Sequence, residues 1–174
     1  MVIFLGAEMM FFVGLIGAFI TFRLGSPIWP PVDQPRRPIG VTGVNTAILL
    51  FSAYWMFRAL RAARQGNWQG LAVGLLTTAL LGTIFLGVQG YEWARLLHFG
   101  LTLSGGVYGA TFYTLVGFHG IHVLAAVIWL LVVLVRATRN RFSAKRHVDV
   151  QLCGMYWFFV VGLWPVLFAL VYLN

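Results

Sequence analysis

Charged residues are scarce in this sequence. Only 9% of its 174 residues are Asp, Glu, Lys or Arg, whereas about 25% is typical of a soluble domain. Hydrophobic residues make up 60% of the chain, and its one cysteine, Cys153, cannot form an internal disulfide. This balance excludes an ordinary soluble domain and predicts an integral membrane protein.

Carboxylates are fewer than basic residues, with four Asp and Glu against twelve Lys and Arg, and the formal net charge is +8. A nucleic-acid-binding domain would gather this charge on one face. The basic residues instead stand between apolar runs, an arrangement that sets orientation in a membrane. We therefore expect no nucleic-acid partner.

The apolar residues fall into five long segments, and about 20 such residues are enough for one helical span. We therefore expect residues 1–174 to form a single all-α membrane domain, a bundle of five transmembrane helices. The expected helices are residues 1–22, 42–64, 69–98, 107–136 and 148–173.

The first segment resembles a signal peptide in hydrophobicity, but it lacks a basic start and a clear cleavage site and contains Glu8. We therefore expect a mature span. No polar residues precede this segment, so the sequence leaves open whether the protein has further residues upstream of Met1.

The basic residues predict the orientation of the bundle. One side of the membrane would receive eight of them and the other four, so by the positive-inside tendency the first side is cytoplasmic. This places the N-terminus in the cytoplasm and the C-terminus outside. The eight are Arg58, Arg61, Arg64, Arg136, Arg139, Arg141, Lys145 and Arg146, and the four are Arg23, Arg36, Arg37 and Arg95.

Proline and tryptophan mark the ends of segments. The connection 23–41 is rich in Pro and Gly, and we expect an extended external loop there. The sixth proline, Pro165, is expected to kink the last helix. Four tryptophans lie near segment ends, as interfacial anchors would. They are Trp29, Trp68, Trp93 and Trp164.

Two carboxyl groups lie within apolar segments. A carboxyl in hydrocarbon either carries a proton or finds a partner. For Glu92, beside Trp93 and Arg95, we favour a structural role with a partner on another helix. Glu8 has no basic residue in its own span, and a proton-linked role and a structural role stay equally open.

His119 and His122 stand three residues apart, on one face of the fourth expected helix. They could begin a metal site, but such a site needs a third or fourth ligand. His98 and His147 lie at opposite ends of the bundle and cannot both converge on the pair. Hydrogen bonding between helices is therefore favoured over a metal or haem site.

Several motifs in this order resemble subunit III of the haem-copper cytochrome c oxidases. The most specific is GVYGATFYTLVGFHGIHV, and GAEMMFFVGLIGAF, NTAILLFSA, QGYEW and YWFFVVGLWPVLFALVY follow the family's other helices. The resemblance covers essentially the whole chain. It implies a short bacterial form with five helices, without the first two of the seven-helix form.

The resemblance implies a subunit of the bacterial inner membrane with no catalytic or metal-binding residue. Haem and copper would be held by partner subunits. The main contact would be subunit I, beside subunit II, small subunits and phospholipid. Residues implied as lipid-binding or proton-linked are Glu8, His119, His122, Arg136 and His147, and those implied as structural polar groups are Asn45, Gln89, Glu92 and Tyr108.

The chain departs from the family pattern in its last helix. Phe158 stands where His is usual, Val161 where Asp is usual and Gln151 where Glu is common. Roles tied to those polar groups are therefore not transferred. The corresponding subunit of a quinol oxidase or a nitric-oxide reductase stays open as an alternative, and so does an independent small transporter.

Overall fold

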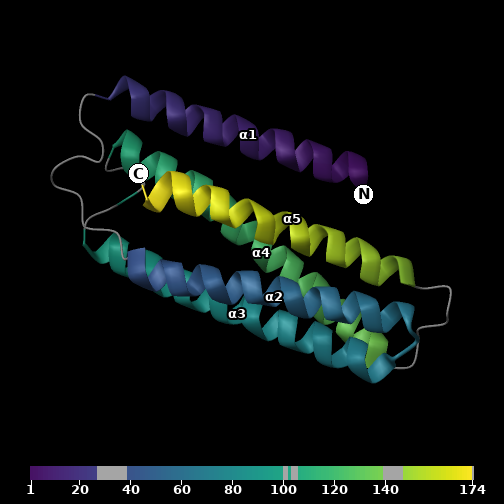
Figure 1. Cartoon of the computed structure of the whole chain (residues 1–174). Coiled ribbons are helices and arrows are strands. Elements are labelled where there is room, and N and C mark those ends of the chain that lie inside the picture. The colour runs from purple at the N-terminus through teal and green to yellow at the C-terminus, as the bar shows by residue number, and fades with distance from the viewer. Residues whose placement is uncertain (27–38, 100–101, 103–105, 139–146, 174) are drawn as a thin grey trace.

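The computed structural model describes residues 1–26, 39–99, 102, 106–138 and 147–173, and these residues form a bundle of helices (Figure 1). Each of five helices is long and apolar enough to cross a membrane, and no strand occurs within the described ranges. The predicted fold class, an all-α bundle of five such helices, is confirmed. The helices are α1 (Val2–Gly25), α2 (Ile39–Arg64), α3 (Trp68–His98), α4 (Val107–Thr138) and α5 (His147–Tyr172).

The helix ends differ from the sequence prediction mainly around the expected external loop 23–41. Helix α1 continues to Gly25 and α2 begins at Ile39, and the loop residues 27–38 lie outside the described part of the chain. At the other end of α2, Gly66 adopts a φ of 70°, a conformation that favours glycine. The next residue, Asn67, caps α3 by accepting a hydrogen bond from the Gly70 N–H at 2.9 Å. A tight turn thus joins α2 to α3.

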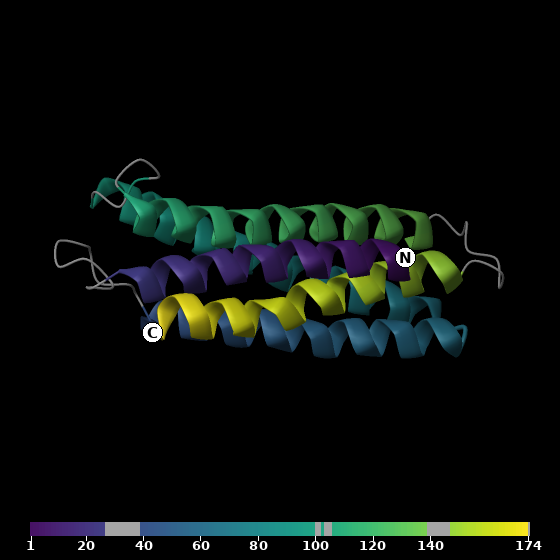
Figure 2. The same ribbon diagram turned by 90° about the horizontal axis from the view of Figure 1, so that it is seen from above.

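Consecutive helices run in opposite directions, so the N- and C-termini lie at opposite ends of the bundle (Figures 1 and 2). Helices α2, α3, α4 and α5 form a ring in which each packs against two others, and the contact between α2 and α3 is the most extensive. Helix α1 lies outside this ring, with a much smaller contact to α4. The assignment of one end to the cytoplasm stays a prediction.

Two tryptophans of α5, seven residues apart, form hydrogen bonds with α2. Trp157 donates a hydrogen bond from Nε1 to the Ser52 hydroxyl at 3.2 Å, and Trp164 donates to the Thr46 hydroxyl at 2.8 Å. Both indoles are fully buried. The prediction that Trp164 is an interfacial anchor is therefore wrong, because its position near a segment end does not reveal which face of α5 it occupies.

The other tryptophans predicted as anchors differ in setting. Trp68 is 37% exposed at the start of α3. Trp93 is partly buried and packs over Gly120 of α4, so it serves the contact between α3 and α4. Trp29 lies outside the described residues. Helix α5 continues without a break through Pro165.

Glycine allows α2 and α3 to approach closely. A Cβ atom added at Gly74 would lie 2.7 Å from the Ala59 Cβ and 2.9 Å from its Cα, closer than such atoms come. Small residues at such a crossing are typical of membrane helices, because they bring the backbones together and increase van der Waals contact. The most extensive contact of the bundle thus depends on a missing side chain.

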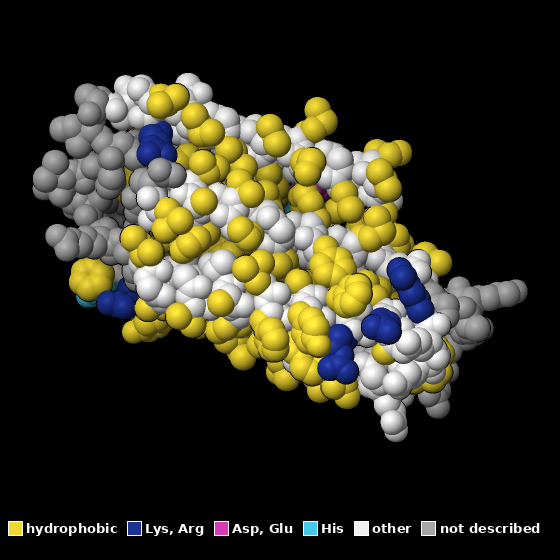
Figure 3. Space-filling model, in the orientation of Figure 1, with side chains coloured by type: hydrophobic (Ala, Val, Ile, Leu, Met, Phe, Trp, Pro, Cys, Tyr) yellow, Lys and Arg dark blue, Asp and Glu magenta, His cyan; other side chains and the backbone are white. Residues whose placement is uncertain are grey.

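The outer surface of the bundle is apolar. Figure 3 shows hydrophobic side chains across the middle of one face and basic side chains near its two ends. Helix α1 is the extreme case, because Phe12 and Phe19 are its buried residues while Ile3 and Met10 are 90% and 77% exposed. Such a surface suits lipid or the helices of a partner rather than water.

We expect Gly74→Ala to destabilise the bundle, because the new methyl group would push α2 and α3 apart. Overpacking of this kind typically costs about 1–3 kcal/mol. Gly87→Ala is the matched control, since it lies on α3 with no atom within 4 Å of the added Cβ. Thermal unfolding of both variants in the same detergent would show a lower Tm for Gly74→Ala alone. Equal Tm values for the two variants would contradict the close approach.

Candidate functional site

The candidate site lies where α1 meets α4. Phe12 and Phe19 are seven residues apart and mark the face of α1 that is turned toward the bundle. Glu8 precedes Phe12 by four residues, so it projects from the same face. The Phe12 ring lies edge-on to His122, with ring centroids 5.1 Å apart. The periodicity of α1 therefore directs Glu8 at the histidines of α4.

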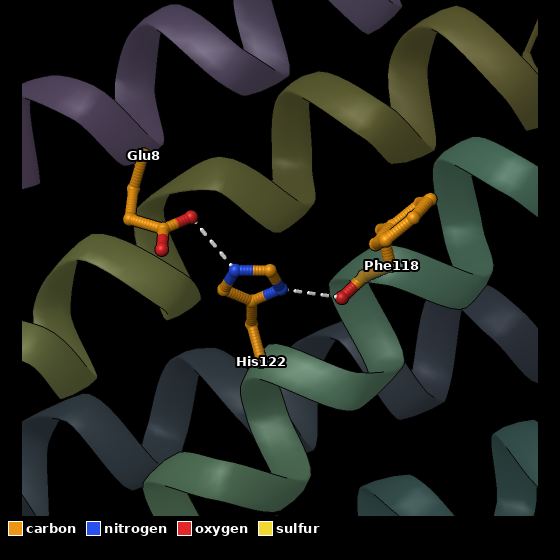
Figure 4. A network of polar contacts seen from close by, with 3 residues as sticks. All are labelled: Glu8, Phe118 and His122. Carbon is orange, nitrogen blue, oxygen red and sulfur yellow. Dashed lines mark hydrogen bonds and ion pairs between the residues drawn. The ribbon is translucent and has the colours of Figure 1, made fainter.

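Glu8 and His122 are in direct contact. Glu8 Oε2 lies 2.8 Å from His122 Nε2 (Figure 4). The two residues are 114 positions apart in the sequence, and their side chains are 20% and 15% exposed, respectively. The other ring nitrogen of His122, Nδ1, lies 2.6 Å from the backbone oxygen of Phe118. Both nitrogens of this histidine are thus engaged.

The partners of His122 limit where its protons are. A backbone carbonyl can only accept, so Nδ1 carries a proton and donates it to the Phe118 oxygen. The contact with Glu8 then has two forms, an imidazolium that donates to a carboxylate or a protonated carboxyl that donates to a neutral imidazole. The pair has no net charge in either form. The two forms differ only in whether the shared proton is bonded to His122 Nε2 or to Glu8 Oε2, atoms that lie 2.8 Å apart.

His119 has a different environment from His122, although both lie on α4. Its ring stacks on Trp164 of α5, with centroids 4.9 Å apart, and Phe12 and Phe85 approach it edge-on. The side chain is buried, and neither ring nitrogen has a hydrogen-bond partner among the described residues. The histidine pair thus faces two ways, with His122 toward α1 and His119 toward α5.

The remaining residues predicted as lipid-binding or proton-linked lie at the end of the bundle where α4 ends and α5 begins. Arg136 is exposed, and its Nη1 lies 3.5 Å from Asp149 Oδ2. An exposed pair at this distance contributes little to stability. His147 begins α5, and its side chain lies outside the described part of the structure. The structure therefore does not bring Arg136 to the Glu8–His122 contact.

Glu92 is buried and paired, as a structural polar group would be. Its carboxylate is buried, and the ion pair found for it, 3.5 Å long, is with Arg95 one turn further along α3. Among the described residues this pair lies within one helix, and the expected partner on another helix stays a prediction. The pair within α3 forms because residues at i and i+3 are neighbours on a helix, so the long Arg95 side chain can contact the Glu92 carboxylate.

Three other residues predicted as structural polar groups are all buried. Asn45 donates from Nδ2 to the backbone oxygen of Phe85 at 3.0 Å, which joins α2 to α3. Gln89 donates to the Tyr172 hydroxyl at 2.9 Å, which joins α3 to α5. The Tyr108 ring lies 6.5 Å from the ring of Phe112 on α4. Asn45 and Gln89 thus connect helices of the ring.

Phe12 and Trp164 were not among the predicted site residues, yet they surround the histidines. A usable signal for Phe12 is its spacing of four from Glu8, and for Trp164 its spacing of seven from Trp157. Within the described ranges, no three His, Cys, Asp or Glu side chains come together in a way that could hold a metal ion. The expectation that haem and copper belong to partner subunits stays a prediction.

The sequence is similar to a known protein family along its whole length. The family model "Cytochrome c oxidase subunit III" matches residues 1–174. A "Cytochrome c oxidase subunit 3" from Synechocystis is 38% identical over 99% of this chain and 73% of the relative. A "Cytochrome c oxidase subunit 3" from Loxodonta africana is 34% identical over 99% of this chain and 67% of the relative. A "Probable cytochrome c oxidase subunit 3" from Nocardia farcinica is 33% identical over 98% and 84%.

These matches agree with the five apolar helices and extend over the motifs that hold Glu8, His119 and His122. They cover the chain from end to end, whereas the chain spans between two thirds and about four fifths of those three relatives. Both the family model and the identities lead to the same assignment, and the chain belongs to the cytochrome c oxidase subunit III family.

Proposed function

We propose that this chain is the non-catalytic subunit III of a haem-copper oxidase that passes electrons from cytochrome c to O₂ and translocates protons. Subunit I is its main contact, and subunit II and small subunits complete the assembly. Haem and copper are held by those partners. The complex lies in the bacterial inner membrane, with the N-terminus of this chain in the cytoplasm.

The observation that carries this proposal is the environment of α1. This helix leaves most of its apolar surface exposed, yet on its inner face it pairs a carboxyl group with a histidine. A helix with so small a contact to its own bundle needs lipid or a partner on its other faces. A subunit that packs against a larger membrane protein has this requirement.

The Glu8–His122 pair gives this subunit a group that can exchange protons inside the membrane. Because it is neutral in either proton arrangement, it is tolerated in a membrane, and it can still exchange a proton with a neighbouring group. We infer that it buffers protons near the entry region of subunit I and that α1 and α4 retain lipid further along their contact. A groove of about 220 Å³ between these helices, lined mainly by apolar side chains such as Leu15 and Phe22 of α1, has room for part of an acyl chain.

Arg136 supports the same role at the end of α4. Its side chain is 57% exposed and its contact with Asp149 is long, so its guanidinium can form paired hydrogen bonds with a lipid phosphate. This contact would hold lipid at the end of the bundle that we assign to the cytoplasm.

Purification in mild detergent tests the assignment. We expect the tagged chain to bring down a haem-containing assembly that oxidises cytochrome c. Spectra and electron-donor assays then separate a cytochrome c oxidase from a quinol oxidase or a nitric-oxide reductase. A stable, haem-free homo-oligomer would contradict the proposal and favour an independent transporter.

We expect Glu8→Gln to leave the initial turnover of the assembled oxidase unchanged within about twofold, because Glu8 is not at the reaction centre. The amide can still donate to His122 Nε2 but cannot take up a proton, so lipid retention and the lifetime of activity should fall. Thr77→Val is the control, since it removes a polar group from α3, away from the contact between α1 and α4 and from Arg136. Complete loss of turnover in a fully assembled Glu8→Gln complex would contradict a non-catalytic subunit.

A further inference from the structure

A second polar site lies across the bundle from α1, where α2 ends and α3 begins (Figure 1). A pocket of about 390 Å³ opens beside the turn that joins these helices. Its polar lining comes from Arg58, Arg61, Gln65 and Asn67. Neither the Glu8–His122 contact nor Arg136 takes part in it.

The pocket is positively charged. Arg58 and Arg61 line it, and both are exposed. No Asp or Glu stands among its lining residues, so the charge of the two guanidinium groups is not balanced within the pocket. The N-terminus of α3, whose cap is Asn67, adds the positive end of a helix dipole. An anion would be favoured here.

A tryptophan packs against one of the two arginines. The Arg58 Cζ atom lies 5.3 Å from the centre of a Trp55 ring, a cation–π arrangement that leaves the edge of the guanidinium free for hydrogen bonds. Trp55 itself lines the pocket beside Arg58.

The other half of the pocket is apolar and opens along the helices. Phe57 of α2 and Val73 of α3 line it and are 57% and 54% exposed, so an apolar chain could lie along them on the outer face of the two helices. A ligand with an anionic head and a hydrocarbon tail matches both halves, whereas a free phosphate would use only the polar half. Basic and aromatic residues at helix ends lie at the level of lipid headgroups.

We propose that the pocket formed by Arg58, Arg61 and Trp55 binds the headgroup phosphate of an anionic phospholipid, with one acyl chain along Phe57 and Val73. The site is separate from the lipid region proposed beside α1, and it does not depend on the oxidase assignment.

Native mass spectrometry of the full chain, purified with the subunits that stay bound and then delipidated, tests this proposal. Dioleoyl phosphatidylglycerol is titrated in as the probe. We expect Arg58→Gln and Arg61→Gln each to weaken its binding about fivefold to tenfold, the change expected for losing one basic group at a membrane surface. Arg64→Gln is the matched control, because Arg64 is exposed on the same last turns of α2 but does not line the pocket.

The outcomes separate a site from general attraction between the basic end and anionic lipid. Equal losses in all three variants, or no loss in Arg58→Gln and Arg61→Gln, would overturn the proposal. Displacement of the lipid by millimolar inorganic phosphate would also overturn it, because the site would then take a free phosphate. Val73→Trp tests the apolar half without changing charge, and binding as tight as in the unmodified chain would show that no acyl chain lies there.

Discussion

Polar groups inside a bilayer are costly unless they find partners within the protein, and this constraint shapes the structure, with buried His119 as an exception among the described residues. The ring of α2, α3, α4 and α5 meets it with hydrogen bonds that also join helices. Two indoles of α5 donate to hydroxyls of α2, Asn45 donates to α3, and Gln89 donates to Tyr172. Because lipid offers such groups no partner of its own, these bonds select which helix faces pack together. Small residues such as Gly74 then let the faces approach.

Helix α1 meets the same requirement with one contact instead of many. Glu8 would be costly in hydrocarbon on its own, and its pairing with His122 removes that cost while it joins α1 to α4. His122 in turn is oriented by its bond to the Phe118 oxygen. This neutral pair is therefore the polar contact, beside the buried rings of Phe12 and Phe19, that positions the helix with the least contact to the bundle, and the proposed role beside a larger partner depends on it.

The sequence predicts the number and type of elements well, because five apolar runs of span length are a direct consequence of bilayer thickness. It predicts partners poorly, because a local pattern shows which face of a helix is polar but not which helix lies opposite. The sequence points to Glu8 and His122 separately, but a local pattern does not reveal their contact across 114 residues. The position of Trp164 near a segment end predicts an interfacial anchor, whereas its burial against Thr46 and His119 depends on the packing of three helices. For Glu92, the spacing of three residues to Arg95 is the local signal that matches the ion pair found.

The central claim is that Glu8 and His122 hold α1 against α4. A double-mutant cycle with Glu8→Ala, His122→Ala and the double variant, read by the unfolding free energy of the protein in detergent, tests it most directly. We expect the two single changes to be non-additive, with a coupling energy of about 1–2 kcal/mol, as for a charge-assisted or interhelical hydrogen bond in a membrane protein. Strictly additive effects, with no measurable coupling, would contradict the claim.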